Sequence, residues 1–555
     1  MLVIIVILVA GFFAFTFNPQ SVSAQMGHQH THEPTEKLGV VNFKVSCNAK
    51  AQKQFNTAVA WLHSFEYEEA EKAFVEVSAS DPRCGMAYWG IAMTNYHTIW
   101  VPPTPTELQK GWAAAEKATS ISAPTQRERD YIQAIETFYK DSDKVDHRTR
   151  TFAYHEAMKR LHLSNPADNE ASVFYALTLV ATGMMLADKT HSREKEAAQI
   201  LNRVLTVEPQ HPGVTHYLIH SYDSPELAEL ALPAARRYAK LAPASSHALH
   251  MPSHIFTRLG LWQEDIESNL AAESAAKAFA VRHHMPGVWD EQLHAMDYLV
   301  YAYLQGAQDK HAWAVLDELK KIKSVDPQTF KVAYACAAIP ARYALERRAW
   351  EEAANLTLPQ GGWSAFPWEQ FRWAEVHIHF ARAIGSAHLG DVKSARREVA
   401  ILHSIQETLM QETGDYDWAK QSLIAREVAS AWVSHAEGNG EEALKVMRAA
   451  ADLDDATNKH PVTPGAILPA REQLGDLLLE LKRPAEALKE FEVSLRSTPN
   501  RFNGLYGAAR AAEIAGDKKA SRAYYTKLVK ICQNADTVRP ELEKAKAFLD
   551  QSSKI

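Results

Sequence analysis

Cysteine is scarce in this chain, with four residues in 555. The four are Cys47, Cys84, Cys336 and Cys532, and no two of them form a C-x-x-C pair. This excludes a zinc knuckle and a thioredoxin-type redox motif. The G-x-S-x-G turn of serine hydrolases and the H-E-x-x-H helix of zinc proteases are also missing, so covalent hydrolase chemistry has no support in the sequence.

The chain has no large excess of charge of one sign. It carries 60 Lys and Arg against 67 Asp and Glu, which leaves a formal net charge of −7. Such a balance gives no general attraction for nucleic acid or anionic lipid, so we expect neither as a partner. With 46% hydrophobic residues the chain has the composition of a folded protein, and its function must come from a local site.

Long apolar runs are also lacking, except for MLVIIVILVAGFFAFTF at the N-terminus. The small-x-small pair Val22 and Ala24 follows this run and predicts a signal peptide over residues 1–24. Because no Lys or Arg precedes the run, an uncleaved membrane anchor is the alternative. Either reading places the rest of the chain in the periplasm or outside the cell. Residues 25–46 include MGHQHTHEP and are expected to form a flexible, His-rich segment.

Two of the cysteines flank the first predicted helical hairpin. Cys47 lies in VSCNAK and Cys84 in DPRCGM. In an oxidising compartment a Cys47–Cys84 disulfide would join the two ends of this hairpin. The alternative is that both are unpaired, small apolar residues of the core.

The remaining sequence is rich in Ala, Leu and Glu, with apolar residues three and four apart, which predicts helix nearly throughout. One pattern recurs in YEEAEKAFVEVSASDP, KEAAQILNRVLTVEP and RPAEALKEFEVSLRSTP. A small residue is followed after four positions by Phe or Leu and after twelve by proline, as in Ala70, Phe74 and Pro82. The small residue lets two helices approach closely, the larger one fills the space beside it, and the proline ends the second helix.

These offsets resemble the second helix of the tetratricopeptide repeat (TPR), whose first helix carries a Leu-Gly pair such as Leu474–Gly475. The chain is similar to a group of exported bacterial TPR proteins with no settled biochemical role. The resemblance implies an all-α fold, in which TPR-like helix pairs stack into an α-solenoid with a right-handed superhelix.

Departures from the repeat divide the array. We expect TPR-like arrays over residues 47–355 and 371–550, separated by an irregular loop at 356–370. This loop and the segments at 99–107 and 459–470 are rich in Pro, Gly or Trp, and they are long enough to fold across the array.

Histidines gather in two neighbouring units of this array. If Pro209 and Pro243 each occupy position 32 of a repeat of 34 residues, the next two units begin at residues 212 and 246. Two of the histidines then occupy positions 5 and 9 of the first unit, and three occupy positions 2, 5 and 9 of the second. The five are His216, His220, His247, His250 and His254. The TPR resemblance implies that these positions line the concave groove of the solenoid.

The spacing of these histidines has a chemical meaning. Two histidines four residues apart on a helix lie one above the other and can bind one metal ion. Packed helices lie about 8–10 Å apart, so the pairs from two adjacent helices can reach the same ion. We therefore predict one divalent site, for zinc or copper, with ligands His216, His220, His250 and His254 and with His247 as a fifth ligand or an outer group. Asp223 and His294 are expected as additional or outer-shell groups.

Three interpretations of function follow. The first is an exported scaffold that holds a protein or peptide partner in its groove and contains a histidine-lined metal site. The second is a metal-dependent enzyme that uses an open coordination position, with Asp223 as base. The third is a protein that sequesters or delivers metal. If no metal is bound, the histidines would instead form a flat polar surface that stacks on a peptide partner.

Overall fold

The computed structural model describes residues 37–99, 102–186, 188–357, 366–412 and 416–552. Helix accounts for 74% of these residues, and they contain no strand. The predicted all-α class and α-solenoid architecture are therefore confirmed, while the hand of the superhelix stays a prediction. The expected signal peptide over 1–24 lies outside the described residues.

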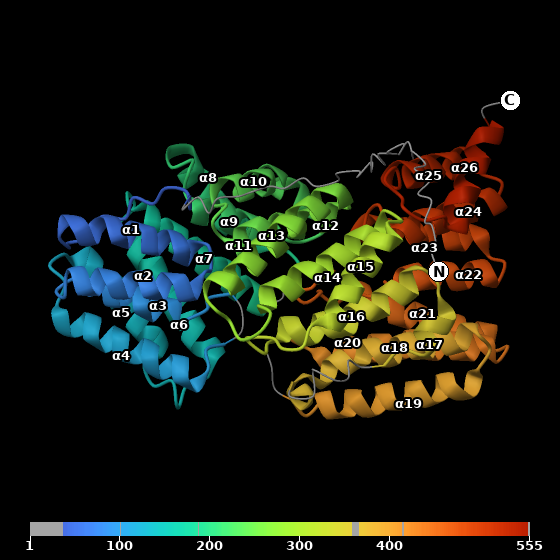
Figure 1. Cartoon of the computed structure of the whole chain (residues 1–555), viewed down its shortest axis with the longest axis horizontal. Coiled ribbons are helices and arrows are strands. Elements are labelled where there is room, and N and C mark those ends of the chain that lie inside the picture. The colour runs from blue at the N-terminus through green and yellow to red at the C-terminus, as the bar shows by residue number, and fades with distance from the viewer. Residues whose placement is uncertain (1–36, 100–101, 187, 358–365, 413–415, 553–555) are drawn as a thin grey trace, which may run out of the picture. The chain divides into compact units, whose positions relative to one another are not determined.

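The first twelve α-helices precede residue 260 (Figure 1). They are α1 (Ala49–His63), α2 (Tyr67–Ser80), α3 (Gly85–Thr94), α4 (Pro105–Ile121), α5 (Gln126–Tyr139), α6 (His147–Ser164), α7 (Asn169–Leu186), α8 (Ser192–Val207), α9 (Pro212–Ser221), α10 (Ala228–Leu241), α11 (Ser246–His250) and α12 (Pro252–Leu259). Within the described part of the chain, no helix is both long enough and apolar enough to cross a bilayer.

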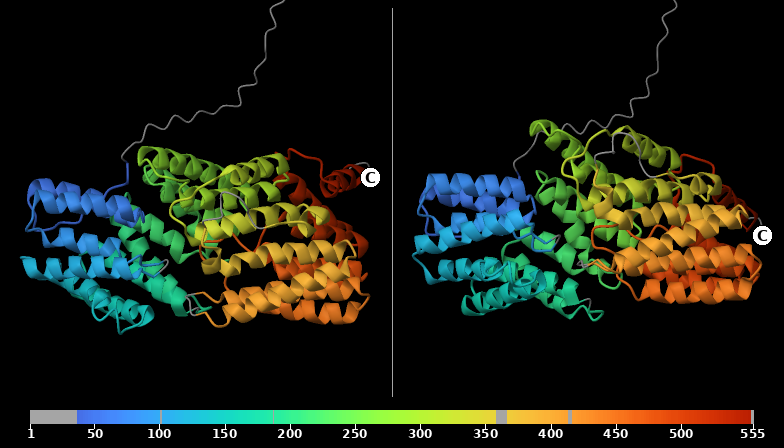
Figure 2. Two further views of the ribbon diagram at one scale, coloured as in Figure 1. Left: turned by 60° about the horizontal axis from the view of Figure 1, so that its bottom comes forward. Right: turned by 90° about the horizontal axis from the view of Figure 1, so that it is seen from below.

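The second group of helices begins at residue 262. They are α13 (Trp262–Arg282), α14 (Asp290–Gln305), α15 (Asp309–Lys321), α16 (Phe330–Glu346), α17 (Trp350–Ala354), the 3-10 helix η1 (Trp368–Phe371), α18 (Arg372–His388), α19 (Val392–Leu409), α20 (Trp418–Ala436), α21 (Gly440–Asp455), α22 (Ala470–Glu480), α23 (Pro484–Ser497), α24 (Phe502–Ile514), α25 (Lys518–Ile531) and α26 (Pro540–Ser552). Helices that follow one another in sequence mostly pack side by side, as Figure 2 shows for α18 to α21.

The recurring small and aromatic residues meet at the helix contacts, as the repeat pattern predicts. Ala70 and Phe74 of α2 are fully buried. A Cβ atom added to Gly90 on α3 would lie 2.3 Å from the Phe74 ring, so the two helices approach closely only because residue 90 is glycine. The same contact recurs near the C-terminus, where a Cβ atom at Gly475 would lie 2.7 Å from the ring of Phe491.

We expect Gly90→Ala to destabilise the protein, although alanine is the better helix former. Replacing glycine in a helix gains about 1 kcal/mol, whereas forcing a methyl group into a packed core costs about 1–3 kcal/mol. The Phe74 ring is fully buried and packs against Phe55 and Trp89, so the packing cost should exceed the gain. Chemical denaturation followed by circular dichroism measures the difference.

Gly85 on the same helix provides the matched control. A Cβ atom there would lie 3.4 Å from Cδ1 of Ile132, close to ordinary van der Waals contact. Gly85→Ala should therefore be neutral or slightly stabilising. Equal effects of Gly85→Ala and Gly90→Ala would contradict the close approach of α2 and α3.

The segment directly before α1 is part of the folded core, so the prediction that it is flexible is wrong. Residues 37–46 were included in the flexible segment over 25–46, but Leu38, Val41 and Phe43 are buried in the core of the first helices. The backbone amide of Val40 donates to the carbonyl of Gln210 at 2.8 Å. The burial of these three apolar side chains makes this segment part of the folded core.

Cys47 and Cys84 form a disulfide, with their Cα atoms 5.1 Å apart. Cys47 lies just before α1 and Cys84 just before α3, so the bond joins the two ends of the first helical hairpin. The other two cysteines, Cys336 and Cys532, are free and buried.

The buried apolar residues form two large clusters and one small one. The first cluster contains residues between Leu38 and Phe256, and the second contains residues between Trp262 and Ala511. The second cluster includes both Ala353 and Trp373, so the loop expected at 356–370 does not separate two hydrophobic cores. The division lies instead between Phe256 and Trp262, next to the predicted metal ligands.

Candidate metal centre

Helix ends position the histidines. α9 begins with Pro212, and the His211 ring just before it accepts a hydrogen bond from the amide of Val214. Proline suits the first position of a helix because its missing N–H would have no partner there. In the same way Pro252 begins α12, directly after α11 and Met251. The pair His250 and His254 therefore spans a junction between two short helices.

The histidines form two groups. In each group the potential ligand atoms all lie within 4.8 Å of one another. The first trio consists of His216, His220 and His247, and the second trio consists of His250, His254 and His294.

The two trios replace the single centre that the sequence predicts. His247 and His250 both belong to α11, yet His247 joins the pair on α9 whereas His250 faces His254. The ring centroids of His247 and His250 are 6.5 Å apart, so the trios are neighbours. His294 on α14, expected as an additional or outer group, stands as the third potential ligand of the second trio.

One aromatic ring packs against all three histidines of each trio. Phe65 lies 4.4–5.7 Å, between ring centroids, from the rings of the first trio. Tyr298 lies 4.8–5.4 Å from those of the second. These contacts constrain the orientation of the histidine rings in both trios.

The Nε2 atoms are the ones that approach one another. His216 Nε2 lies 3.1 Å from His220 Nε2 and 3.2 Å from His247 Nε2. In the second trio, His250 Nε2 and His254 Nε2 are 3.1 Å apart. Two imidazole nitrogens that bind one zinc ion at about 2.0–2.1 Å lie about 2.8–3.4 Å apart, so this spacing fits shared coordination.

The hydrogen bonds of His250 determine where its proton lies. Its Nδ1 lies 2.7 Å from Oδ1 of Asn269. The amide nitrogen of Asn269 donates to the backbone carbonyl of Asp265 at 2.9 Å, which fixes Oδ1 as the atom that faces His250. An amide oxygen only accepts hydrogen bonds, so Nδ1 of His250 carries a proton, and its Nε2 has a lone pair in the neutral ring.

Hydrogen bonds also determine where the proton of His254 lies. Its Nδ1 lies 3.1 Å from Oδ2 of Asp223, and the other carboxylate oxygen of Asp223 accepts from Nε of Arg258 at 2.8 Å. Asp223 is thereby held ionised and accepts the Nδ1 proton of His254. It occupies the place expected of an outer-shell carboxylate, which orients a histidine toward a metal.

Two lone pairs thus face each other across 3.1 Å, on His250 Nε2 and His254 Nε2. A proton between them would require a charged imidazolium. Burial lowers the pKa of His250 well below its usual value, and it also lowers the pKa of His254, although Asp223 acts in the opposite direction. Both rings are therefore neutral at pH 7, and a cation between the two nitrogens would relieve their repulsion.

The first trio shows part of the same arrangement. Nδ1 of His216 donates to the backbone carbonyl of His63 at 2.7 Å, so its Nε2 also presents a lone pair toward His220 and His247. Burial lowers the pKa of His216 well below its usual value and that of His220 to about 3.

A third group, His63, Glu170 and His211, has a different hydrogen-bond pattern. Each carboxylate oxygen of Glu170 accepts from one ring, at 3.0 Å from His63 Nε2 and 2.9 Å from His211 Nε2. The other ring nitrogens accept, from Tyr217 in one case and from the amide of Val214 in the other. Each ring nitrogen here has a complementary partner, so this group is a polar network that supports the first trio through the His63 carbonyl.

The trios lie inside the structure. His216, His250, His254 and His294 are at most 6% exposed, and His220 and His247 are half-buried. The four buried rings therefore do not face an open groove, which is the position implied by the TPR resemblance. Stacking on a peptide partner is excluded for these four in the described conformation.

A loop that is distant in sequence contacts Tyr298, the aromatic residue that packs against the second trio. The hydroxyl of Tyr298 donates to the carbonyl of Val462 at 3.1 Å. Nearby, Nζ of Lys459 donates to the carbonyl of Thr463 at 2.8 Å. Burial lowers the pKa of Lys459 to about 7, although the charge of Asp223 acts in the opposite direction. The loop after α21 thus brings a lysine, whose charged form is disfavoured by burial, into the surroundings of the trios.

Some of these positions carried no signal in the sequence. Asn269 and Glu170 lie in ordinary helical sequence, and only the fold brings them to the histidines. Lys459 lies in a loop whose length indicated that it could cross the array, but its contact with the site depends on helices far from it in sequence.

No protein-family model matches the chain, and no curated protein matches it. Among solved structures, a tetratricopeptide repeat protein from Parabacteroides merdae is 12% identical, with a TM-score of 0.29, over 56% of this chain and 98% of that chain. A structure of the human IFIT1 dimer with m7Gppp-AAAA is 12% identical, with a TM-score of 0.35, over 88% of this chain and 91% of that chain. Neither similarity transfers a ligand or a partner to this chain.

Proposed function

We propose that this protein is an exported, TPR-like helical scaffold that binds divalent transition-metal ions in its two histidine trios. The proposal is based on the Nε2 atoms of His250 and His254. They lie 3.1 Å apart, each presents a lone pair, and no proton donor lies between them. Neutral imidazoles suit Zn²⁺ or Cu²⁺. The Cys47–Cys84 disulfide supports export to an oxidising compartment.

Burial of the site bears on the alternative functions. A protein that delivers metal must release it, whereas four of the six rings are almost fully enclosed. Three protein ligands for each ion leave coordination positions open, as in catalytic zinc sites. This favours a metal centre that binds a further small ligand, and a metal-dependent enzyme is the second candidate. The outer surface of the helical array remains available for a protein partner.

Replacing His250 and His254 together with asparagine should remove one of the two metal ions. Asparagine keeps a polar group at each position but lacks the imidazole nitrogen that binds zinc. After incubation with Zn²⁺ and dialysis, we expect two ions for each wild-type chain and one for the double variant. Inductively coupled plasma mass spectrometry measures the ratio, and circular dichroism shows whether the helices are retained.

His155→Asn is the matched control. His155 is also a buried histidine on a helix, and its Nδ1 lies 2.9 Å from the hydroxyl of Thr178, but it belongs to neither trio. This variant should keep both ions. A wild-type protein that retains no zinc would disprove the proposed function, and a double variant that retains both ions would place the site elsewhere.

A further inference from the structure

With metal bound, the two trios would carry a large positive charge. Two divalent ions held by six neutral imidazoles would bring four positive charges into a mostly buried space. Asp223 is the carboxylate that contacts a ring of the two trios in the described residues, and it already pairs with Arg258. Buried charge is costly unless it is neutralised, so a negative ligand from solution would stabilise the ions.

A further cation lies beside the trios. The ammonium group of Lys459 donates to the carbonyls of Pro461 and Thr463, and within the described ranges no carboxylate lies at ion-pair distance from it. It is close enough to Asp223, His250 and His254 to act on their charges. Burial lowers the pKa of Lys459 to about 7, and an anion bound beside it would favour its charged ammonium form.

A second lysine near the trios already has carboxylate partners. Lys331 acts on His247, His250 and His294 through its charge. Its Nζ lies 2.5 Å from Oε1 of Glu291 and 3.6 Å from Oδ2 of Asp290. Lys331 thus has two carboxylate partners, whereas Lys459 contacts only backbone carbonyls. A negative ligand would therefore find its lysine partner in Lys459.

We infer that the two metal ions together bind one phosphate group, as inorganic phosphate or a phosphate monoester, and that Lys459 contacts it. This inference rests on the proposed function. Two metal ions and a protonated Lys459 would need three acceptor oxygens, one for each ion and one for the lysine. Phosphate supplies them with up to two negative charges, whereas a carboxylate has only two oxygens. Lysine is a common partner of phosphate in proteins, and paired metal ions commonly bind phosphoryl oxygens.

His220, His247 and Lys459 are half-buried, so they are the residues of this region that a ligand from solution can reach. The three ring nitrogens of each trio would hold one metal ion and leave its other coordination positions to a ligand from solution. Neither the first trio nor the second supplies a carboxylate ligand of its own, so the coordination left open by the protein is available to the anion.

The test uses the full chain loaded with Zn²⁺ and freed of excess metal, with metal content measured on the same sample. Isothermal titration with inorganic phosphate, phenyl phosphate and acetate compares the ligand classes. We expect the two phosphates to bind and acetate to bind at least tenfold more weakly. Metal-free protein should not bind them. Lys459→Met should weaken phosphate binding at least tenfold, and Lys459→Arg should largely restore it.

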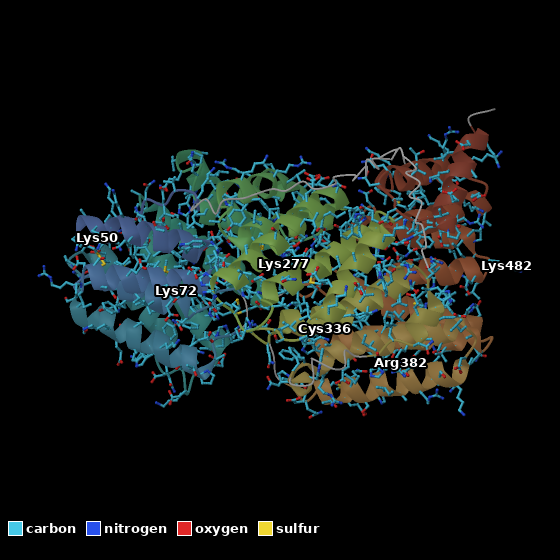
Figure 3. All side chains as sticks on the ribbon, viewed as in Figure 1. Lys50, Lys72, Lys277, Cys336, Arg382 and Lys482 are labelled. Carbon is cyan, nitrogen blue, oxygen red and sulfur yellow. A yellow bond between two sulfur atoms is a disulfide. The ribbon has the colours of Figure 1, made fainter. Side chains whose placement is uncertain are left out.

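Lys50→Met is the matched control, because Lys50 is an exposed lysine on α1 (labelled in Figure 3) and should leave binding unchanged. A protein that retains two zinc ions but does not bind phosphate would overturn this inference and leave the proposed function intact. The inference would also be overturned by any of three results. These are equal phosphate binding by the metal-free protein, equal affinity for acetate and phosphate, and full phosphate affinity in Lys459→Met. A protein that retains no zinc would overturn both.

Discussion

Removing zinc from the loaded protein with a chelator should lower its free energy of unfolding by about 4 kcal/mol for each ion, when the free metal is about 1,000-fold above the dissociation constant. The reason is that the ions bind the folded trios and have little affinity for the separated histidines of the unfolded chain. Without metal, His250 Nε2 and His254 Nε2 again present lone pairs to each other at 3.1 Å. Chemical denaturation with and without chelator measures the loss.

A variant with one trio removed provides the control. His250→Asn/His254→Asn should lose about half as much stability on chelation as the wild type, because only the first trio still binds an ion. Unfolding that does not depend on metal, in a sample shown to lose zinc on chelation, would contradict a buried metal centre. It would indicate ions bound at the surface.

Arg501→Met should destabilise the C-terminal helices by about 3–5 kcal/mol, the typical cost of leaving buried charges without their partner. Arg501 is fully buried, and its guanidinium donates to Glu472 at 3.0 Å and to Glu346 at 2.8 Å. It also donates to the hydroxyl of Tyr301 at 2.8 Å. These bonds join α14, α16, α22 and the start of α24. Calorimetry and amide hydrogen exchange in these helices measure the effect.

Neutralising the whole network tests this explanation. The triple variant Arg501→Met, Glu346→Gln and Glu472→Gln has no buried charge without a partner, so it should be more stable than Arg501→Met alone. A single variant that loses less than about 1 kcal/mol would show that water or neighbouring groups compensate the two carboxylates. A triple variant less stable than the single one would show that the hydrogen bonds, rather than the charges, stabilise this region.

The fold was predictable because its signals are local. Ala70, Phe74 and Pro82 lie within one helix and its end, so their spacing alone predicts a helix that packs closely and then stops. All-helical architecture follows when such a pattern recurs along the chain. The four-residue spacing of His216 and His220 likewise places both rings on one side of α9, and they meet there with Nε2 atoms 3.1 Å apart.

The sequence by itself determined the helical repeat, the disulfide-capable cysteines at the ends of the first hairpin, and the two histidine pairs, because each depends on spacing within one or two helices. Only the tertiary structure decided that the pairs belong to two centres. The third histidine of each trio comes from another helix, and its choice depends on how α9, α11, α12 and α14 pack. Burial of the trios, the proton positions set by Asn269 and Asp223, and the approach of Lys459 likewise depend on contacts between distant segments. No spacing along the chain encodes such contacts, because they arise from the shape of the packed array.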